Sequence, residues 1–458
     1  MKVLIVNANI VVPHKERVLE RSSLIAYNGI ITRIDEGVRY RHDTTSDLII
    51  DADEGLLIPG LINSHSHGFT LGPLFPSAAK PLPLGMVFRN LNRHLLQGTT
   101  TLLNLDGFAL PEEVEIVNKL HPVKVKTGTS HTPLNVKAAE LADGSGLTPT
   151  HKAMTVEEML RRGAVAIGEI GGGHTLAGGG AVYLEIPQAI EKRTGRRITP
   201  AQASKLLTAV LGRYADPSQL DREKVSESLK EIRLDDVLTV DDAIDIVMGT
   251  AYKSVETARE GIKEAAELAL RYNVPMIVHT APPSKRVILE VARKLGPLLI
   301  AGHTNHPTFE EKEMLQVARE LRSYGAIIDL CSGDGFGARQ LYSPEAVDAT
   351  LKMLREGLGD IITTDYMGGY WDPMLLLIKK AVEENVLSLP KAIAMATYNV
   401  ARAIPALAQN AGTIDVGKTA DLVVLSADDI SRVRYVLIDG IPVVVDGKIR
   451  VPSFLQVA

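Results

Sequence analysis

The chain has 458 residues, of which 45% are hydrophobic, and its formal net charge is −5. This length exceeds that of one small domain, and the mild charge, without a basic stripe, argues against nucleic acid or an anionic membrane surface as a partner. Cys331 is the single cysteine, so an intramolecular disulfide is impossible and a reducing compartment is expected. The N-terminus lacks the apolar segment of a secretory signal, and no apolar stretch reaches membrane-spanning length. We therefore expect a cytoplasmic protein.

Short strands are predicted at both ends of the chain. Near the N-terminus they cover residues 2–12, 22–27, 30–35 and 48–51, with Asn28-Gly29 as a hairpin turn. Near the C-terminus they cover residues 421–425, 434–438 and 442–445. Because strand-rich ends flank a middle region of alternating strands and helices, we expect residues 1–58 and 410–458 to meet and build one small β-sandwich domain.

The segment from Gly55 to His67 is the most informative part of the sequence. Its apolar run ends in His65-Ser66-His67. Alternate side chains of an extended strand share a face, so the two imidazoles point the same way. Two imidazoles on one face at the end of a buried strand form half of a metal site. A pair of polar residues where a strand enters a loop is the alternative, which so short a motif does not exclude by itself.

Four further apolar runs also end in a residue of a type that binds metal ions. Each run has the length of a buried parallel strand and is too short for a helix. The residues at their ends are Glu169, His279, His303 and Asp365. In a closed parallel barrel the C-terminal edge of the strands carries the active site, because the loops that follow the strands gather there. Five such strand ends in one chain favour a shared site over isolated core residues.

Sequences with helical periodicity separate the strands in the middle of the chain. Apolar residues at helical spacing predict helices at residues 260–272, 287–295, 310–324, 347–358 and 375–386. Further strands are predicted at residues 98–104, 123–127 and 326–330. The pattern therefore contains eight strands, each followed by a helix or by room for one.

The interval between Glu169 and His279 is longer than one crossover helix requires. Thr199-Pro200 followed by Gln202 has the form of a capping box at the start of a helix, and Thr239 begins another helix. We expect a helical insertion at about 187–258 over the mouth of the barrel. It would shape a substrate lid or a subunit contact, and the sequence leaves both open.

These features resemble the amidohydrolase superfamily of metal-dependent hydrolases over nearly the whole chain. The matching segments are Pro59-Gly60 before the two histidines, the Gly98-Thr99-Thr100 strand, and residues 412–424 near the C-terminus. The resemblance implies an α/β fold: a (β/α)8 TIM-type barrel over residues 59–409 with a small β-sandwich built from both chain termini. Many members carry a carboxylated lysine in strand 4. This chain has Glu169 there, a departure that resembles the enamidase, adenine deaminase and N-acetylglucosamine-6-phosphate deacetylase branches. Among these, residues 167–170 and Gly302-His303 look most similar to enamidase.

The resemblance also implies a set of metal ligands, which are His65, His67, Glu169, His279, His303 and Asp365. Four neutral imidazoles and two carboxylates suit borderline divalent metals better than calcium or magnesium. Six ligands are too many for one tetrahedral ion, so we expect a binuclear centre with Glu169 as the bridging carboxylate. The expected ions are zinc at both positions, or zinc with iron, with manganese as an alternative.

The expected reaction is hydrolysis of a C–N bond other than a peptide bond, as in an amide, a cyclic amide or a lactam. The ions would lower the pKa of a bound water from about 16 towards 7, so that hydroxide forms at neutral pH. Asp365, together with His303, would be catalytic, with Asp365 as metal ligand and general base. Alternatives are an adenine-deaminase-like aminohydrolase, an N-acyl deacetylase, and a scaffold without activity, which the complete ligand set argues against.

Two further residues are candidates for substrate binding. His131 follows the third strand of the barrel and could bind a substrate carbonyl, unless it is an ordinary loop histidine. Arg339 follows the seventh strand and could pair with a substrate carboxylate, unless it is a solvated surface arginine. The glycine-rich residues 171–180 lack the spacing of a dinucleotide or phosphate loop. We expect a small-molecule substrate, a homo-oligomer, and no nucleic-acid or membrane partner.

Overall fold

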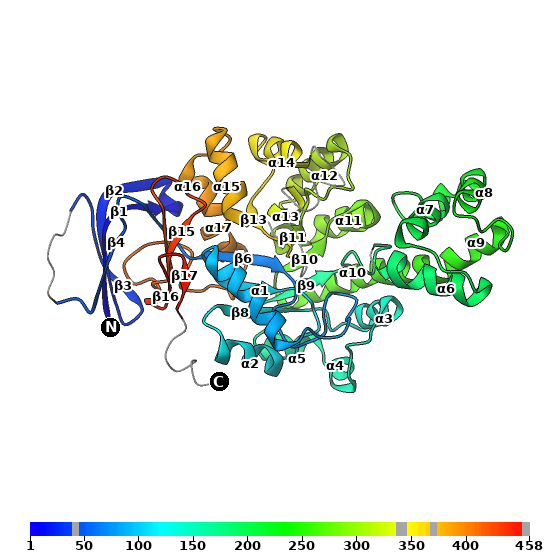
Figure 1. The fold of residues 1–458 in the computed structure, drawn as a ribbon, viewed down its shortest axis with the longest axis horizontal. Coiled ribbons are helices and arrows are strands. Elements are labelled where there is room, and N and C mark those ends of the chain that lie inside the picture. Colours follow the sequence, from blue (N-terminus) through cyan, green and yellow to red (C-terminus); the bar gives the residue numbers. More distant parts are fainter. Residues whose placement is uncertain (39–44, 179, 336–345, 367–372, 451–458) are drawn as a thin grey trace.

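The computed structural model describes the chain except for residues 39–44, 179, 336–345, 367–372 and 451–458. At its centre eight parallel strands form one sheet in chain order (Figure 1): β6 (Leu61–Ser66), β7 (Thr99–Asn104), β8 (Lys124–Thr129), β9 (Ala166–Ile170), β10 (Met276–His279), β11 (Leu299–Gly302), β12 (Ile327–Cys331) and β13 (Ile361–Thr363). The last strand returns to the first. The backbone N–H of Asp365 donates to the carbonyl of His65 at 3.0 Å, and that of His67 donates to the carbonyl of Tyr366 at 2.8 Å. The sheet is therefore closed into a barrel.

Helices cover the outside of the barrel, and the longer ones turn an apolar face towards it. In α10 (Lys253–Tyr272), for example, Ile262, Ala265, Ala266 and Ala269 are buried at helical spacing. The other surrounding helices are α1 (Leu84–Leu96), α2 (Pro111–Leu120), α3 (Pro133–Ala142), α4 (Pro149–Ala153), α5 (Val156–Arg161), α11 (Lys285–Leu295), α12 (Glu311–Ser323), α13 (Ser332–Gly335), α14 (Ala346–Arg355), α15 (Met374–Glu383), α16 (Leu389–Met395) and α17 (Tyr398–Ala403).

The two ends of the chain build a second, mixed sheet. Its nine strands in the described residues are β1 (Lys2–Val12), β2 (Arg17–Tyr27), β3 (Ile30–Asp35), β4 (Leu48–Asp51), β5 (Leu56–Pro59), β14 (Leu422–Leu425), β15 (Val433–Ile438), β16 (Ile441–Val445) and β17 (Lys448–Ile449). Strand β5 joins the two ends, because it pairs with β1 on one side and with β14 on the other. The predicted (β/α)8 barrel is confirmed, and so is a small β-domain built from both termini; this domain, predicted as a β-sandwich, is one mixed sheet.

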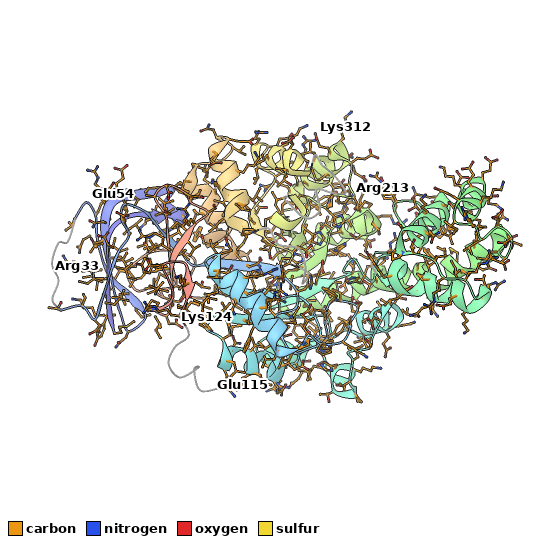
Figure 2. All side chains as sticks on the ribbon, viewed as in Figure 1. Arg33, Glu54, Glu115, Lys124, Arg213 and Lys312 are labelled. Carbon is orange, nitrogen blue, oxygen red and sulfur yellow. The ribbon has the colours of Figure 1, made fainter. Side chains whose placement is uncertain are left out.

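Two lysine–carboxylate contacts join this second sheet to the barrel. Lys124, the first residue of β8, lies 2.9 Å from Asp421, which precedes β14, and 2.7 Å from Asp439, which follows β15. Figure 2 shows Lys124 at the boundary between the two parts of the molecule. Because β5 runs through Gly60 directly into β6, the sheet also anchors the strand that carries the His-x-His motif.

Four of the helices between β9 and β10 form a compact group with a hydrophobic core of its own. They are α6 (Ile186–Thr194), α7 (Pro200–Leu211), α8 (Arg222–Glu231) and α9 (Val240–Val247). The capping box at Thr199 is present: Thr199 Oγ1 accepts from the backbone of Gln202 at 3.3 Å, and Gln202 Oε1 accepts from the backbone of Thr199 at 2.8 Å. Residues 253–258, at the end of the predicted insertion, belong to α10.

This helical group lies at the end of the molecule opposite to the terminal sheet (Figure 1). A small apolar cluster that includes Ala138, Ala215 and Ala258 connects it to the barrel, and so do several polar contacts. The guanidinium of Arg259 on α10 donates to the carbonyls of Tyr214, Ala215 and Pro283 at distances between 2.6 and 3.2 Å. Arg213, labelled at the junction in Figure 2, lies 2.8 Å from Glu313 on α12. In the described part of the chain, no helix combines the length and the apolar character needed to cross a bilayer.

Candidate metal centre

The six predicted ligands lie at the C-terminal ends of five barrel strands. His65 is in β6 and His67 directly follows it; Glu169 is in β9, and His279 is the last residue of β10. His303 comes one residue after β11 and Asp365 two residues after β13, so both predicted strands end slightly earlier than expected. All six side chains are buried. The structure brings together all the residues that the sequence predicts as ligands.

Glu169 lies among the four imidazoles. Its Oε1 is 3.0 Å from Nδ1 of His279, 3.2 Å from Nε2 of His303 and 3.6 Å from Nε2 of His65. Its Oε2 is 3.5 Å from Nε2 of His67. One carboxylate therefore contacts ligand candidates from β6, β10 and β11.

Asp365, which follows β13, contacts two of the same four histidines. Its Oδ1 lies 3.7 Å from Nε2 of His65 and 3.6 Å from Nε2 of His67. Among the described residues, His65, His67 and Asp365 form one group whose ligand atoms lie within 4.8 Å of one another, and His65, Glu169 and His303 form another. The two groups share His65, so any ions that they bind would be neighbours.

The electrostatics of this cluster favour positive charge. Burial opposes protonation of His65, but the hydrogen bond to Asp329 and the nearby carboxylates outweigh it and hold the pKa of the imidazole well above 6.5. Burial likewise raises the pKa of Glu169, yet contacts with His279, His303 and His65 outweigh it and keep that pKa well below 4.5. Burial, reinforced by His303, lowers the pKa of His279 to about 4. The ionised carboxylate of Glu169 and the neutral imidazole of His279 are in the protonation states that metal binding requires, whereas a bound cation would have to displace the proton that the carboxylates favour on His65.

The atoms at the centre fit a divalent cation. Nε2 of His65 is buried without a hydrogen-bond partner in the described structure, although it faces Glu169 and Asp365 at 3.6 and 3.7 Å. Such separations are too long for hydrogen bonds. A nitrogen lone pair that faces two carboxylates in this way suits a shared cation, and four nitrogens with two carboxylates are donors for zinc or iron.

Two buried carboxylates that the sequence reading did not identify hold the His-x-His pair. Nδ1 of His67 lies 3.2 Å from Asp106, which follows β7, and Nδ1 of His65 lies 3.0 Å from Asp329 in β12. In each case the bonded nitrogen is Nδ1, which leaves Nε2 directed at the centre. The available signals were an aspartate inside the apolar run of β12 and another directly after β7.

The backbone next to the centre is unusual at two ligand candidates. His303 and Asp365 have φ angles of +35° and +42°, in the left-handed region that residues with side chains rarely adopt. Backbone strain of this kind persists where the surrounding structure enforces it, commonly at functional sites. Gly302 gives the room that His65 needs, because a Cβ atom there would lie 2.7 Å from Cε1 of the His65 ring.

The structure describes one of the two residues predicted to bind substrate. His131 is buried after β8; its Nδ1 lies 3.0 Å from Thr129 Oγ1, and its ring packs edge-on against Phe108. Its Nε2 is buried with no hydrogen-bond partner among the described residues. The neighbouring Ser130 donates to the carbonyl of Glu169 at 2.9 Å, so this loop does contact the ligand cluster. Arg339 lies outside the described residues.

Residues 152–450 match the amidohydrolase family. The chain belongs to this family. The resemblance predicted from the two histidines, the Gly98-Thr99-Thr100 strand and the C-terminal segment is confirmed at the family level.

Two curated relatives of this amidohydrolase match part of the chain. The 5-methylthioadenosine/S-adenosylhomocysteine deaminase of Caldanaerobacter subterraneus subsp. tengcongensis is 27% identical over 187 residues, or 36% of this chain. The imidazolonepropionase of Thermoplasma acidophilum is 28% identical over 177 residues, or 38% of this chain. The chain spans 40% of the length of each of these relatives.

Solved structures match over nearly the full length of the chain. β-Aspartyl dipeptidase from Fervidobacterium islandicum AW-1 gives a TM-score of 0.56 at 16% identity and covers 99% of both chains. L-Hydantoinase from Arthrobacter aurescens gives a TM-score of 0.53 at 13% identity and covers 98% of this chain and 97% of its own. At such identities the likeness shows a common fold.

Three other buried histidines of this amidohydrolase predict a loss of stability in acid. Burial lowers the pKa of His94 and His121 from 6.5 to about 4 and that of His131 to about 3. At a pH between the lowered pKa of each folded-state histidine and 6.5, the unfolded chain binds protons that the folded chain does not. The free energy of unfolding is therefore at its full value above pH 6.5 and falls as the pH drops towards 4.

The His121→Gln variant tests this pH dependence. Removing one titrating histidine is expected to reduce the acid-induced loss of unfolding free energy by up to about 3 kcal/mol, from about 1.36 kcal/mol per pKa unit. Urea unfolding of the wild type and the variant at several pH values from 7 to 4.5 measures the two slopes. Equal slopes would show that His121 titrates alike in both states.

Proposed function

We propose that this amidohydrolase hydrolyses a C–N bond other than a peptide bond, in an amide, a cyclic amide or a lactam, at a centre of two divalent cations. The observation that supports the proposal is the position of Glu169 within 3.6 Å of a nitrogen of all four clustered histidines, with Asp365 beside two of them. A glutamate in the fourth barrel strand, where other members carry a modified lysine, is the reason for proposing an enamidase-like type.

The six residues divide into two sets, with Glu169 between them. His65, His67 and Asp365, which form one candidate group, would hold one cation. His303, which forms another candidate group with His65 and Glu169, and His279, whose Nδ1 lies 3.0 Å from Glu169, would hold the other. Glu169 contacts histidines of both sets and would bridge them. When bound, zinc or iron ions supply positive charge that polarises a carbonyl group and lowers the pKa of water towards neutrality.

Asp365 is the residue that we propose transfers a proton from water to the leaving nitrogen. Together with His279 it is the most exposed of the six side chains, at 8% of its surface, so it borders the open side of the cluster. In the proposed reaction its carboxylate accepts a proton from water as the new C–O bond forms. It then donates that proton to the leaving nitrogen as the C–N bond breaks, which restores the carboxylate. His303, which is also a ligand candidate, is the second residue that we propose as catalytic. His131 would bind the substrate carbonyl.

The division of the chain follows from the same proposal. Residues 59–409 would form the catalytic barrel, residues 1–58 and 410–458 the terminal β-domain, and residues 187–258 a helical insertion whose last six residues begin α10. The separate core of the helices between β9 and β10 supports treating them as an added unit. A homo-oligomer remains a prediction.

An activity screen of the metal-loaded protein tests the proposed function. The substrates are a lactam, a hydantoin and an N-acyl amino acid, assayed with protein containing zinc, iron or manganese and with chelated protein. Hydrolysis of at least one amide that disappears on chelation and returns with metal is the expected result. Protein that neither binds these metals nor hydrolyses any of the substrates would contradict the proposal.

A deaminase is the second candidate function, because the matching relative from Caldanaerobacter is a 5-methylthioadenosine/S-adenosylhomocysteine deaminase. The same centre could attack the amino-bearing carbon of a purine ring. Adding 5-methylthioadenosine and adenine to the screen separates the two reactions. Ammonia released from these aminopurines, with no lactam or acyl amide hydrolysed, would favour the deaminase.

A further inference from the structure

Strand β12 contributes none of the six predicted ligands, yet it carries a charged residue in its interior. Asp329 lies between Ile328 and Leu330 and is 1% exposed. A buried carboxylate is costly unless hydrogen bonds and positive charge compensate it. Its partners therefore indicate what it does.

The carboxylate of Asp329 contacts residues from three other parts of the barrel. Its Oδ2 lies 3.0 Å from Nδ1 of His65 in β6 and accepts the backbone N–H of His303 at 3.2 Å. Its Oδ1 accepts the hydroxyl of Thr363 in β13 at 2.7 Å. The backbone carbonyl of the same residue accepts the N–H of Thr304 at 2.8 Å.

These contacts set the geometry of two ligand candidates. With Nδ1 of His65 donating to Asp329, the lone pair of Nε2 points between Glu169 and Asp365. His303 holds its left-handed φ of +35° while its own N–H and that of Thr304 are both bonded to Asp329. Both histidines belong to one of the candidate metal groups.

We propose that Asp329 is a positioning residue of the metal centre, which orients the ring of His65 and fixes the backbone of His303. The inference rests on the proposed function, because it requires that these histidines bind a cation. A carboxylate behind a ligand histidine also makes the imidazole a stronger donor, and loss of such a partner lowers metal affinity by about 10- to 100-fold.

The variants Asp329→Asn and Asp329→Ala separate charge from geometry. An asparagine can keep an oxygen at the position of Oδ2, where it accepts from His65 and His303, while its NH2 donates to Thr363 Oγ1. The Thr363 hydroxyl can then donate to Cys331 Sγ, from which it is 2.9 Å distant. Asp329→Asn thus removes mainly the charge, whereas Asp329→Ala removes both the charge and the bonds.

Asp360→Asn is the matched control. Asp360 also binds the backbone of β12, accepting from Ile328 at 2.8 Å, and it pairs with Arg322 at 2.8 Å. It precedes β13 and therefore lies at the opposite end of the strands from the metal centre. A general disturbance of β12 should affect all three variants, whereas a positioning role should affect only those at Asp329.

The measurement is metal affinity, independent of turnover. Zn²⁺ affinity is obtained by competition with a chelator, and the visible spectrum of the Co²⁺-loaded protein reports the ligand geometry. We expect Asp329→Asn to weaken Zn²⁺ binding by about 10- to 100-fold and Asp329→Ala at least as much, with an altered Co²⁺ spectrum for the alanine variant. Asp360→Asn should keep the wild-type affinity and spectrum.

Three outcomes would overturn the proposal, and they are distinguishable. Unchanged affinity and spectra in both Asp329 variants would remove the positioning role and leave the metal centre intact. A thiolate-to-cobalt band in the wild type would place Cys331, and with it Asp329, among the ligands, since both form a candidate group with His65. A wild type that binds no divalent metal would end this proposal together with the proposed function. Should Asp329→Ala not fold, Asp329→Asn decides alone.

Discussion

Replacing Asp365 with asparagine is expected to lower turnover by about 10²- to 10⁴-fold, the usual contribution of a general acid–base residue. The amide cannot take up the proton that the carboxylate removes from water, nor return it to the leaving nitrogen. Metal should remain bound, because the amide oxygen can still occupy the position of Oδ1 beside His65 and His67. Asparagine also tolerates the φ of +42° found at this position.

The matched control for this experiment is Asp360→Asn, since Asp360 and Asp365 flank the same strand, β13, at its two ends. Steady-state kinetics with the best substrate of the screen, together with elemental analysis of bound metal, measure the effect. Turnover of Asp365→Asn within about threefold of the wild type, with metal present, would contradict the role of Asp365 as the base.

Replacing Glu169 with glutamine is expected to remove metal as well as turnover. Glu169 lies within hydrogen-bond distance of His279 and His303 and close to His65 and His67. A neutral amide is a much weaker ligand and cannot bridge two cations, so the content should fall from about two ions per chain to one or fewer. Activity should fall by at least the factor expected for Asp365→Asn.

Elemental analysis after dialysis against a weak chelator measures the loss of metal from Glu169→Gln. Glu313→Gln is the matched control, because Glu313 is also a largely buried carboxylate, 2.8 Å from both Lys285 and Arg213, but it lies outside the candidate metal groups. The control should keep its metal. A Glu169→Gln protein with its full complement of ions and normal activity would show that Glu169 is not a ligand.

Much of the candidate site could be predicted from local patterns. A buried parallel strand needs a short apolar run, and its last residue faces the edge where the active site of a barrel lies. The runs that end at Glu169 and His279 are therefore visible without any tertiary information. The predicted ends of two strands were wrong: β11 ends at Gly302 and β13 at Thr363, before the ligand candidates His303 and Asp365. Both of these residues adopt a positive φ.

The barrel, the β-domain from both termini and the order of the six ligand candidates can be predicted from the amino-acid sequence, because strand alternation and apolar runs are properties of neighbouring residues. The carboxylates that support the histidines become visible when the chain is folded. Asp106 is 39 residues from its partner His67, and Asp329 is 264 residues from His65. No local periodicity encodes such contacts. They arise when the barrel closes and brings β12 beside β11 and β13, and the last strand beside the first.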